Sequence, residues 1–361
     1  MTTIPSWLAK SLSNSHQKYI QHTLQQREST RASLRSLQLR GRDPPTEIPQ
    51  NLLQYYSIAA GCHPDNANKN RYADVQPYDR TRVVVDVEST QRYLNASWCL
   101  ERFGHKWWIG AQAPLPTTAH AFLSLIAQPI TFPPVTPQST LRPSPRTTRV
   151  RTVIQLTRNT EGGHRKAHTY FPSSVGQSVV FPAEAGYSGP ALKVTLLESV
   201  DVPEACCIKS TVSISPVGHH QIEENPVMFQ HLLFTAWPDQ GVPASKDQKS
   251  FLAFLRLVDS TNRDRGHDDP DPPAIVGCSA GIGRTGTFIA ISSLLRAHGF
   301  LPAAAAPCPL SLASPLGPVP SAFDDDLVAQ EVDSLREQRS GMVQQASQLE
   351  LIYTLLSAAF V

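Results

Sequence analysis

Two rhythms of apolar and polar residues run along this chain, and each predicts one kind of secondary structure. Short apolar runs rich in Val, Ile, Phe and Thr, bounded by turn residues, predict strands. Longer stretches with apolar residues three and four positions apart predict helices. The expected strands are 83–87, 151–157, 192–200, 205–214, 227–237 and 273–277. The expected helices are 117–127, 247–259, 285–298, 326–338 and 346–359. Strands interspersed with helices, without an internal repeat, indicate a layered α/β domain.

Some segments stand apart from this pattern. Residues 1–50 are rich in Gln, Ser, Leu and Arg with a weak helical period, so we expect an N-terminal helical arm followed by one domain over residues 51–361. Three Pro-rich or acidic stretches lie near 131–148, 261–271 and 301–326. Such compositions bury too little apolar surface to offset the entropy of ordering, so we interpret them as flexible insertions. The two Pro-rich insertions are candidates for docking a partner.

Composition and charge narrow the classes of function. The 361 residues include 31 prolines, well above the average usage of about 5%. Lys and Arg number 32 against 30 Asp and Glu, and this balance argues against a nucleic-acid binder. The six cysteines form no C-x-x-C pair, so neither a zinc spacing nor a disulfide framework is indicated. No secretory signal or membrane-length apolar run is visible, so we expect a cytoplasmic protein, with access to the nucleus left open.

The clearest chemical signal is an apolar strand that runs into a glycine-rich loop and then a helix. The loop reads Cys278-Ser279-Ala280-Gly281-Ile282-Gly283-Arg284-Thr285-Gly286. Its glycines match G-x-G-x-x-G, but no Asp or Glu occurs between Asp271 and Asp324, so the acidic ribose ligand of a dinucleotide site is missing. The lysine of a Walker phosphate loop is missing as well. Both nucleotide-binding interpretations therefore fail.

What remains is an anion cradle with a thiol at one end and a guanidinium at the other. Backbone N–H groups at a helix N-terminus, together with the helix dipole, attract an anion. The same field stabilises a thiolate, which is the nucleophilic form of cysteine. Arg284 can hold two oxygens of a tetrahedral anion at once, as Lys cannot. The Cys-(x)5-Arg-Thr loop therefore suits attack on phosphorus, and it resembles the signature loop of the cysteine-based protein tyrosine phosphatases of the non-receptor type.

This resemblance implies a fold and a set of roles for the loop. The fold would be a single layered α/β domain with a central twisted mixed β-sheet flanked by helices. Cys278 would be the nucleophile, Arg284 would stabilise the transition state, and Thr285 would stabilise the departing thiolate. The remaining loop positions would hold the phosphate, and these are Ser279, Ala280, Gly281, Ile282 and Gly283. No metal and no cofactor would be needed.

A second segment, Trp237-Pro238-Asp239, resembles the mobile acid loop of that family. By the resemblance, Asp239 would protonate the departing tyrosine oxygen and then act as the base that activates water. Trp237 would support the loop. We expect loop closure to exclude water and so to raise the pKa of the Asp239 carboxyl.

Further matches concern the substrate and the hydrolytic water. Tyr72 and Asp74 lie in a segment that resembles the phosphotyrosine recognition loop, where the ring would wall a deep cleft and the carboxylate would bind the substrate backbone. Glu161 would pair with the signature arginine. The other matching positions would approach the acid loop, position the water and support that position; they are Lys166, Gln344 and Gln348.

The sequence departs from the family at three positions. Gly277 stands where a histidine usually precedes the nucleophile, Gln240 stands in place of Phe, and Ala113 stands in place of Gly. Loss of the histidine should weaken thiolate stabilisation without removing a reacting atom, so we expect a slower but competent enzyme acting on phosphotyrosine-containing proteins. Two alternatives remain. One is a catalytically weak phosphotyrosine binder, and the other is a phosphatase of broader specificity, for phosphoserine, phosphothreonine or phosphoinositides.

Overall fold

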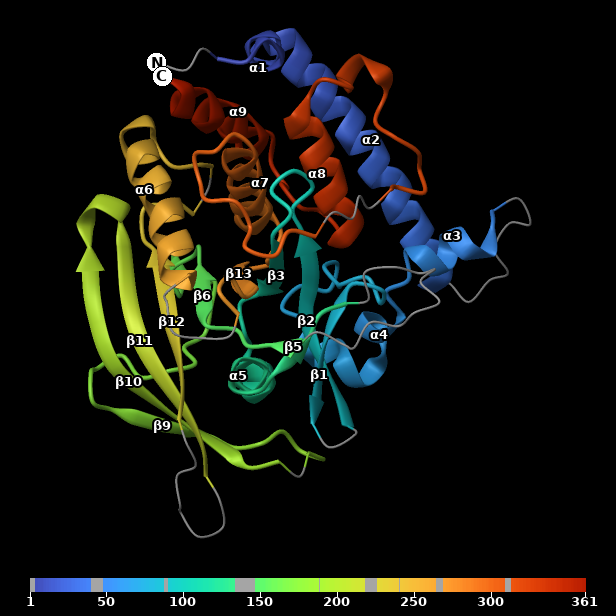
Figure 1. Ribbon diagram of the computed structural model, residues 1–361. Coiled ribbons are helices and arrows are strands. Elements are labelled where there is room, and N and C mark those ends of the chain that lie inside the picture. Colours follow the sequence, from blue (N-terminus) through green and yellow to red (C-terminus); the bar gives the residue numbers. More distant parts are fainter. Residues whose placement is uncertain are drawn as a thin grey trace.

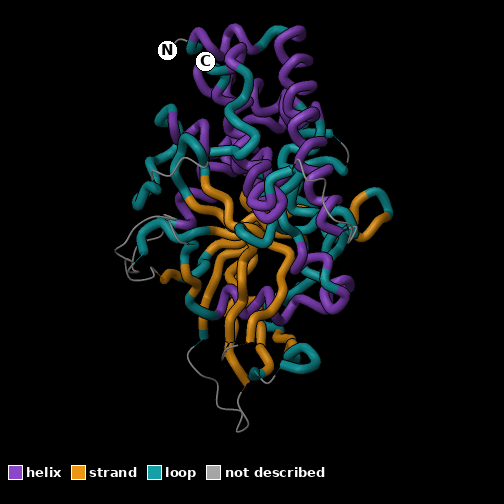
Figure 2. The backbone as a smooth tube through the Cα atoms, turned by 90° about the vertical axis from the view of Figure 1, so that its right-hand side faces the viewer, coloured by secondary structure: helices purple, strands orange, loops and turns teal. Residues whose placement is uncertain are grey.

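A nine-stranded sheet runs through the middle of the molecule, with helices on both of its faces (Figure 1). The computed structural model describes residues 4–39, 48–87, 90–133, 147–187, 189–217, 226–239, 241–263, 269–308 and 313–361. When the molecule is turned by 90° about the vertical axis, the strands fan out below a thick layer of helices (Figure 2). This arrangement confirms the expected class, a layered α/β domain with a mixed central sheet.

The sheet is parallel in its centre and antiparallel on both flanks. Its order is β1 (Arg82–Val87), β2 (Thr90–Leu100), β3 (Trp107–Gln112), β13 (Ala274–Cys278), β6 (Thr152–Gln155), β12 (Val227–Phe234), β11 (Cys207–Val217), β10 (Ala191–Val202) and β9 (Ser178–Phe181). The strand β13 pairs in parallel with β3 on one side and with β6 on the other, and β6 pairs in parallel with β12. Because the carboxyl ends of parallel strands share one edge, the loops after β6, β12 and β13 emerge together. Two small ribbons pair β4 (Ile130–Thr131) with β5 (Thr147–Thr148) and β7 (Thr160–Glu161) with β8 (His164–Arg165).

Helices cover the two faces of the sheet unequally. The helix α5 (Ala119–Ala127) packs on one face, and the other face carries α6 (Ser245–Asn262), α7 (Gly283–Ala297), α8 (Leu327–Gln338) and α9 (Ala346–Phe360). Alternation along β13 serves both layers, because Ile275 packs in the α5 cluster and Val276 in the cluster of the other helices. The N-terminal part supplies α1 (Ser6–Ser11), α2 (Asn14–Leu39), α3 (Gln50–Tyr55) and α4 (Ala59–Cys62).

A strand or helix occupies every position at which the sequence predicts one, with ends that differ by a few residues. The sequence pattern missed β2, β3 and β9. In β2 the signal was broken by polar residues that point into the protein, since Asn95 and Ser97 have no exposed surface. Interior polar residues interrupt an apolar run, so a buried strand of this kind escapes a hydrophobicity pattern.

The expected arm and insertions pack more closely than their composition indicates. Within the described residues 4–39, Leu8 and Leu24 are buried in the same cluster as α7 and α9. In the expected insertion 301–326, the side chains of Leu301 and Phe323 are buried. Residues 134–146 and 264–268, the middle parts of the other two insertions, lie outside the described residues. The domain boundary at residue 50 stays a prediction.

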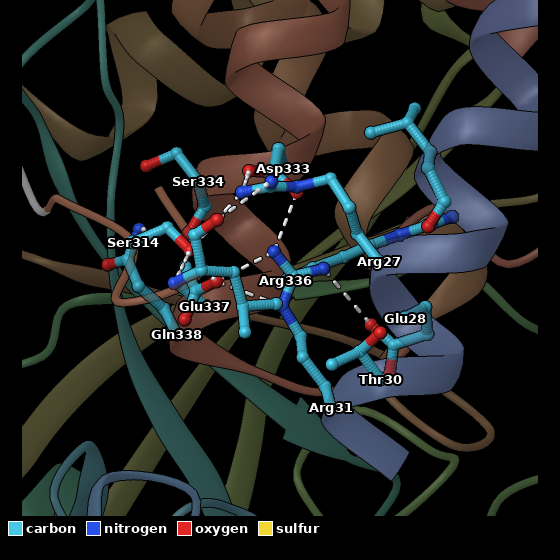
Figure 3. A network of polar contacts seen from close by, with 12 residues as sticks. Arg27, Glu28, Thr30, Arg31, Ser314, Asp333, Ser334, Arg336, Glu337 and Gln338 are labelled. Carbon is cyan, nitrogen blue, oxygen red and sulfur yellow. Dashed lines mark hydrogen bonds and ion pairs between the residues drawn. The ribbon is translucent and has the colours of Figure 1, made fainter. Parts of the chain in front are cut away.

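An ionic network fixes α2 against α8 (Figure 3). Arg31 of α2 has no exposed surface and donates to Asp333 at 2.6 Å and to Glu337 at 2.7 Å. Burial acts to lower the pKa of Arg31, but the two carboxylates outweigh it and raise that pKa. Arg27 adds a second guanidinium, which is bound to Asp333 at 2.8 Å and to the Gly317 carbonyl oxygen at 2.7 Å. The arm is therefore held by charge that is removed from water.

We expect Arg31→Ala to lower the free energy of unfolding by about 3–5 kcal/mol, because it leaves buried carboxylates without their cation. Urea denaturation of the full chain measures this loss. Lys18→Ala is the matched control on the same helix, because it also removes a cation, but from an exposed side chain. That control should cost no more than about 1 kcal/mol. Equal losses of unfolding free energy in the two variants would contradict the stabilising role of the buried Arg31 ion pairs.

Candidate active site

The loops that follow the parallel strands enclose a pocket of about 230 Å³ at one edge of the sheet. Cys278 is the last residue of β13 and lies at the pocket wall. Most of the residues singled out from the sequence also line it: Tyr72, Asp74, Glu161, Lys166, Asp239, Ser279, Ala280, Ile282, Gly283, Arg284, Gln344 and Gln348. Three others, Gly281, Thr285 and Trp237, do not line the pocket and support it from behind. The structure thus brings together residues from Tyr72 to Gln348, which are 276 positions apart in sequence.

The loop after Cys278 can form only because of a glycine. Gly281 has φ of +70°, and a Cβ atom there would lie 2.2 Å from the carbonyl oxygen of Ala111. Only glycine adopts this conformation without strain and allows so close an approach. The chain then enters α7 at Gly283, so the N-terminus of a 15-residue helix adjoins the thiol. Beneath it, the buried Thr285 hydroxyl donates to Cys278 Sγ at 3.4 Å.

Arg284 is held by a planar, two-pronged contact. Its Nη1 and Nη2 atoms donate to the two carboxylate oxygens of Glu161, each at 2.8 Å. Nη2 also donates to the Pro238 carbonyl oxygen at 2.7 Å, which ties the acid loop to the signature loop. Glu161 itself accepts from the Thr157 hydroxyl at 2.8 Å. Because both carboxylate oxygens are used, Arg284 has a fixed orientation, as the sequence predicts for this pair.

The acid loop carries Asp239 to the opposite side of the pocket, where it meets Lys166. Their charged atoms, Asp239 Oδ1 and Lys166 Nζ, are 2.8 Å apart. The hydrogen bond from Lys166 lowers the pKa of Asp239, burial opposes this effect, and the charge of Lys166 lowers the pKa further. The expected raised pKa is therefore wrong for this state of the pocket, because the lysine outweighs the exclusion of water. Behind the loop, Trp237 is buried and donates to the Gly241 carbonyl oxygen at 3.1 Å.

Tyr72 stands at the rim and is tied to the loop below it. Ser279 Oγ donates to the Lys166 carbonyl oxygen at 2.8 Å, so the Tyr72 hydroxyl is the donor in its own 2.8 Å contact with Ser279. The Tyr72 side chain is 37% exposed, as suits a ring that forms one wall of an open cleft. Gln348 Oε1 accepts from the backbone N–H of Gln345 at 3.1 Å. Gln344 also lines the pocket.

Arg339 supports the site, and the sequence analysis missed it. It is wholly buried at the end of α8 and donates to the carbonyl oxygens of Gly281 at 2.7 Å and Ala280 at 3.0 Å. It also donates to Asn95 Oδ1 at 2.8 Å. Arg339 does not line the pocket, so it draws these carbonyl oxygens away from the place where an anion would bind. The sequence offers little signal for such a residue, because its partners are backbone atoms and neutral side chains.

Gly277 lies in a tight approach of β13 to β3. A Cβ atom at this position would lie 2.7 Å from the Ala111 carbonyl oxygen, so any side chain requires β3 to shift. The Gly277 carbonyl oxygen accepts from the Leu156 amide at 2.8 Å. The Ala113 amide donates to the Cys278 carbonyl oxygen at 3.0 Å, and Gln240 lies outside the described residues. A histidine at position 277 would therefore require β3 and β13 to move apart.

The described part of the chain holds neither a cluster of metal-ligating side chains nor a membrane-spanning helix. No group of three or more His, Cys, Asp or Glu side chains there could hold a metal ion. Equally, none of the described helices combines the length and the apolar character that a bilayer crossing requires.

Sequence comparison assigns this fold and pocket to a class. A family model described as protein-tyrosine phosphatase matches residues 66–130 and 146–299, which is more than half of the chain. The chain belongs to the protein-tyrosine phosphatase family. The matched region contains the Cys278 loop, the acid loop and Glu161, whereas Gln344 and the arm lie outside it.

Individual relatives carry the comparison further. The chain is 31% identical over 292 residues to tyrosine-protein phosphatase non-receptor type 2 of Rattus norvegicus, covering 80% of this chain and 55% of that protein. It is 32% identical over 233 residues to the receptor-type tyrosine-protein phosphatase eta of Homo sapiens, covering 64% and 14%. The chain thus spans about half or less of these relatives. The crystal structure of the catalytic domain of human protein tyrosine phosphatase non-receptor type 18 has the same fold, with a TM-score of 0.60, 24% identity, and coverage of 84% of this chain and 88% of that one.

Proposed function

We propose that this protein hydrolyses phosphotyrosine in proteins through a cysteinyl-phosphate intermediate. The observation that carries the proposal is the meeting of a thiol, a fixed guanidinium and a carboxyl in one pocket, from Cys278, Arg284 and Asp239. A helix N-terminus adjoins the thiol, so the pocket suits a dianionic phosphate and a thiolate nucleophile. The test is turnover of a phosphotyrosine peptide by the full chain, read as released phosphate.

In the first step, Cys278 Sγ forms a bond to phosphorus while the bond from phosphorus to the tyrosine oxygen breaks. Asp239 gives its proton to that oxygen, and Arg284 with the loop amides stabilises the charge on the phosphoryl oxygens. The negative charge of a bound phosphate raises the pKa of the nearby Asp239 carboxyl and so opposes the effect of Lys166. Asp239 can therefore carry a proton in the complex.

In the second step, water attacks phosphorus and the bond from sulfur to phosphorus breaks. Asp239, now ionised, takes the proton of the water, and Gln344 at the pocket surface orients it. The Thr285 hydroxyl already donates to Cys278 Sγ, so it stabilises the thiolate that leaves. The enzyme returns to its starting state with inorganic phosphate as product.

The open rim supports phosphotyrosine as the substrate. The Tyr72 ring can pack on a substrate phenol and add about 0.5–1.5 kcal/mol beyond the burial of area. A phosphoserine side chain is shorter, so its phosphate would not reach Cys278 from the same rim. Paired peptides that differ only in phosphotyrosine or phosphoserine decide between this specificity and a broader one, because a phosphatase of broad specificity would cleave both.

A second candidate, a catalytically weak phosphotyrosine binder, rests on the glycine at position 277. The pocket would then capture a phosphorylated partner without releasing phosphate. Burst kinetics distinguish the two functions. An enzyme releases dephosphorylated peptide continuously, whereas a binder holds one equivalent of the phosphorylated peptide.

Removal of the Lys166 charge should shift the pH dependence of the enzyme. Asp239 acts as an acid only when protonated, and Lys166 lowers its pKa. Lys166→Met should therefore raise that pKa and move the alkaline limb of kcat/KM to higher pH. Lys166→Arg keeps the ion pair and should keep the limb in place. A limb that does not move in Lys166→Met, or moves to lower pH, would refute this role of the lysine.

A further inference from the structure

Another cavity, of about 260 Å³, lies between the strands β10 to β12 and the segment 168–173. Three rings, those of Tyr170, Phe171 and His231, form one part of its wall, and Leu196 and Leu233 form another. Tyr170 and Leu196 also belong to the apolar cluster of α5, so the cavity lies on that face of the sheet. We name this cavity the ring pocket.

The ring pocket differs from the catalytic pocket in charge. No Asp, Glu, Lys or Arg of the described chain lines it, whereas both acids and bases line the catalytic pocket. Its two imidazoles are neutral at pH 7. Burial lowers the pKa of His231 to about 3, and burial together with the charge of Arg71 lowers the pKa of His168. An ion would lose its water here without meeting an opposite charge, so the ring pocket suits an uncharged molecule.

The hydrogen bonds of Gln155 decide which nitrogen of His231 carries the proton. Gln155 Nε2 donates to the Thr157 carbonyl oxygen at 2.7 Å and to Asn159 Oδ1 at 3.1 Å. A carbonyl oxygen only accepts, so the amide nitrogen is on that side and Gln155 Oε1 faces His231 Nε2, 3.2 Å away, as an acceptor. His231 therefore holds its proton on Nε2, and its Nδ1 bears a lone pair.

This lone pair is an acceptor that the protein leaves unused. His231 is only 3% exposed, and no described group donates to its Nδ1. The Nδ1 atom is not wholly enclosed, and because His231 lines the ring pocket, that remaining surface faces the cavity. A nearly buried acceptor without a donor costs free energy, and a ligand that brings an N–H or O–H group removes this cost.

The rings around the acceptor favour a flat aromatic ligand. The ring centroids of Phe171 and His231 are 4.9 Å apart with an interplanar angle of 62°, and those of Tyr170 and Phe171 are 5.3 Å apart at 78°. An added ring can continue this edge-to-face packing. Pockets for drug-sized molecules begin at about 300 Å³, so the ring pocket suits a molecule of one or two fused rings.

From this arrangement we infer that the ring pocket binds a small uncharged aromatic molecule whose N–H or O–H group donates a hydrogen bond to His231 Nδ1. The site is separate from the phosphate-binding loop, because neither Cys278 nor Arg284 lines it. The inference therefore does not depend on the proposed function.

The experiment titrates the full chain with two probes, indole and benzofuran, which have the same shape and differ in whether the ring carries an N–H. We expect indole to bind about three- to tenfold more tightly, as one hydrogen bond to a nearly buried acceptor implies. Indole should also shift the nitrogen NMR resonance of His231 Nδ1, and benzofuran should not. Vanadate, which resembles phosphate, should leave the affinity for indole unchanged.

A variant that fills the cavity locates the site. Ser199 is an exposed residue of β10 that lines the ring pocket, so Ser199→Trp should abolish indole binding. Ser178→Trp is the matched control, because Ser178 is an exposed residue of the neighbouring β9 outside the pocket lining, and each serine contacts one hydroxyl across its strand pair. That control should bind indole as the wild-type chain does.

Several results would overturn the inference. Equal affinity for indole and benzofuran would show that His231 Nδ1 accepts no hydrogen bond. Indole binding that survives Ser199→Trp, or that vanadate abolishes, would place the molecule elsewhere. If Ser199→Trp fails to fold, the comparison of the two probes and the resonance of His231 in the wild-type chain decide the outcome.

Discussion

Replacement of Cys278 by serine is expected to lower turnover of a phosphotyrosine peptide by at least about a thousandfold, with peptide affinity kept within a few-fold. A serine hydroxyl does not ionise in this pocket as a thiol can, so no competent nucleophile remains. The loop amides, Arg284 and Glu161 are unaffected by the exchange of sulfur for oxygen, so the phosphate is still bound. Turnover and affinity thus separate in one variant.

Steady-state phosphate release and calorimetric titration of the same peptide measure the two effects. Cys62→Ser is the matched control, since Cys62 is partly exposed and does not line the pocket, and it should leave turnover unchanged. If the wild-type chain releases phosphate no faster than Cys278→Ser but binds the peptide equally well, the protein is a phosphotyrosine binder and the proposed hydrolysis is wrong.

Asp239→Asn is expected to lower kcat by about 10²–10⁴-fold, because the leaving tyrosine oxygen loses its proton donor. An asparagine amide keeps the size of the side chain and removes only the proton and the charge. The alkaline limb that Asp239 imposes should disappear from the pH profile. The loss should shrink for an aryl phosphate whose phenol is acidic, because such a leaving group departs without protonation.

Initial rates with two aryl phosphates of different leaving-group acidity measure this effect. Asp325→Asn is the matched control, because Asp325 is exposed and lies outside the pocket lining. The same loss for both leaving groups would show that Asp239 holds the loop in place without transferring a proton. Retention of the alkaline limb would assign that limb to another group.

The parts of the fold that the sequence predicts well are those that local pattern decides. The run that became β13 and the periodic stretches that became α7 and α9 carry uninterrupted signals. Most of the candidate site residues that line the pocket could be singled out, because a thiol, a guanidinium and glycines at fixed spacing have few other uses. The buried residue Arg339 was not predicted, because it acts through the backbone carbonyl oxygens of residues that are distant in sequence. No spacing of residue types indicates such a contact.

Charge was the property that the sequence predicted least well. A loop carboxyl was expected to have a raised pKa, but the approach of Lys166 to Asp239 depends on where two loops meet in space. Residues 1–50 were expected to form a helical arm separate from the domain that follows. In the structure, Arg31 of this arm pairs with Asp333 and Glu337 of α8. The partners are more than 300 residues apart, so inspection of the sequence does not reveal the pairing.

The pairing of α2 with α8 determines which shortened fragments of this protein can keep the pocket intact. A fragment trimmed to the family match, from residue 66 onward, would keep the pocket-lining residues from Tyr72 to Arg284 and lose Arg27 and Arg31, the two arginines of α2 that bind Asp333. Asp333, if retained, would lose its two guanidinium partners, and the apolar residues of α8 and α9 that pack against Ile20 and Leu24 would be exposed to water. Arg336 of α8 donates to the Leu24 carbonyl oxygen of α2 and to the Met342 and Val343 carbonyl oxygens just before Gln344, so loss of α2 would disturb the pocket wall at Gln344 as well. Expression work should therefore begin upstream of residue 14.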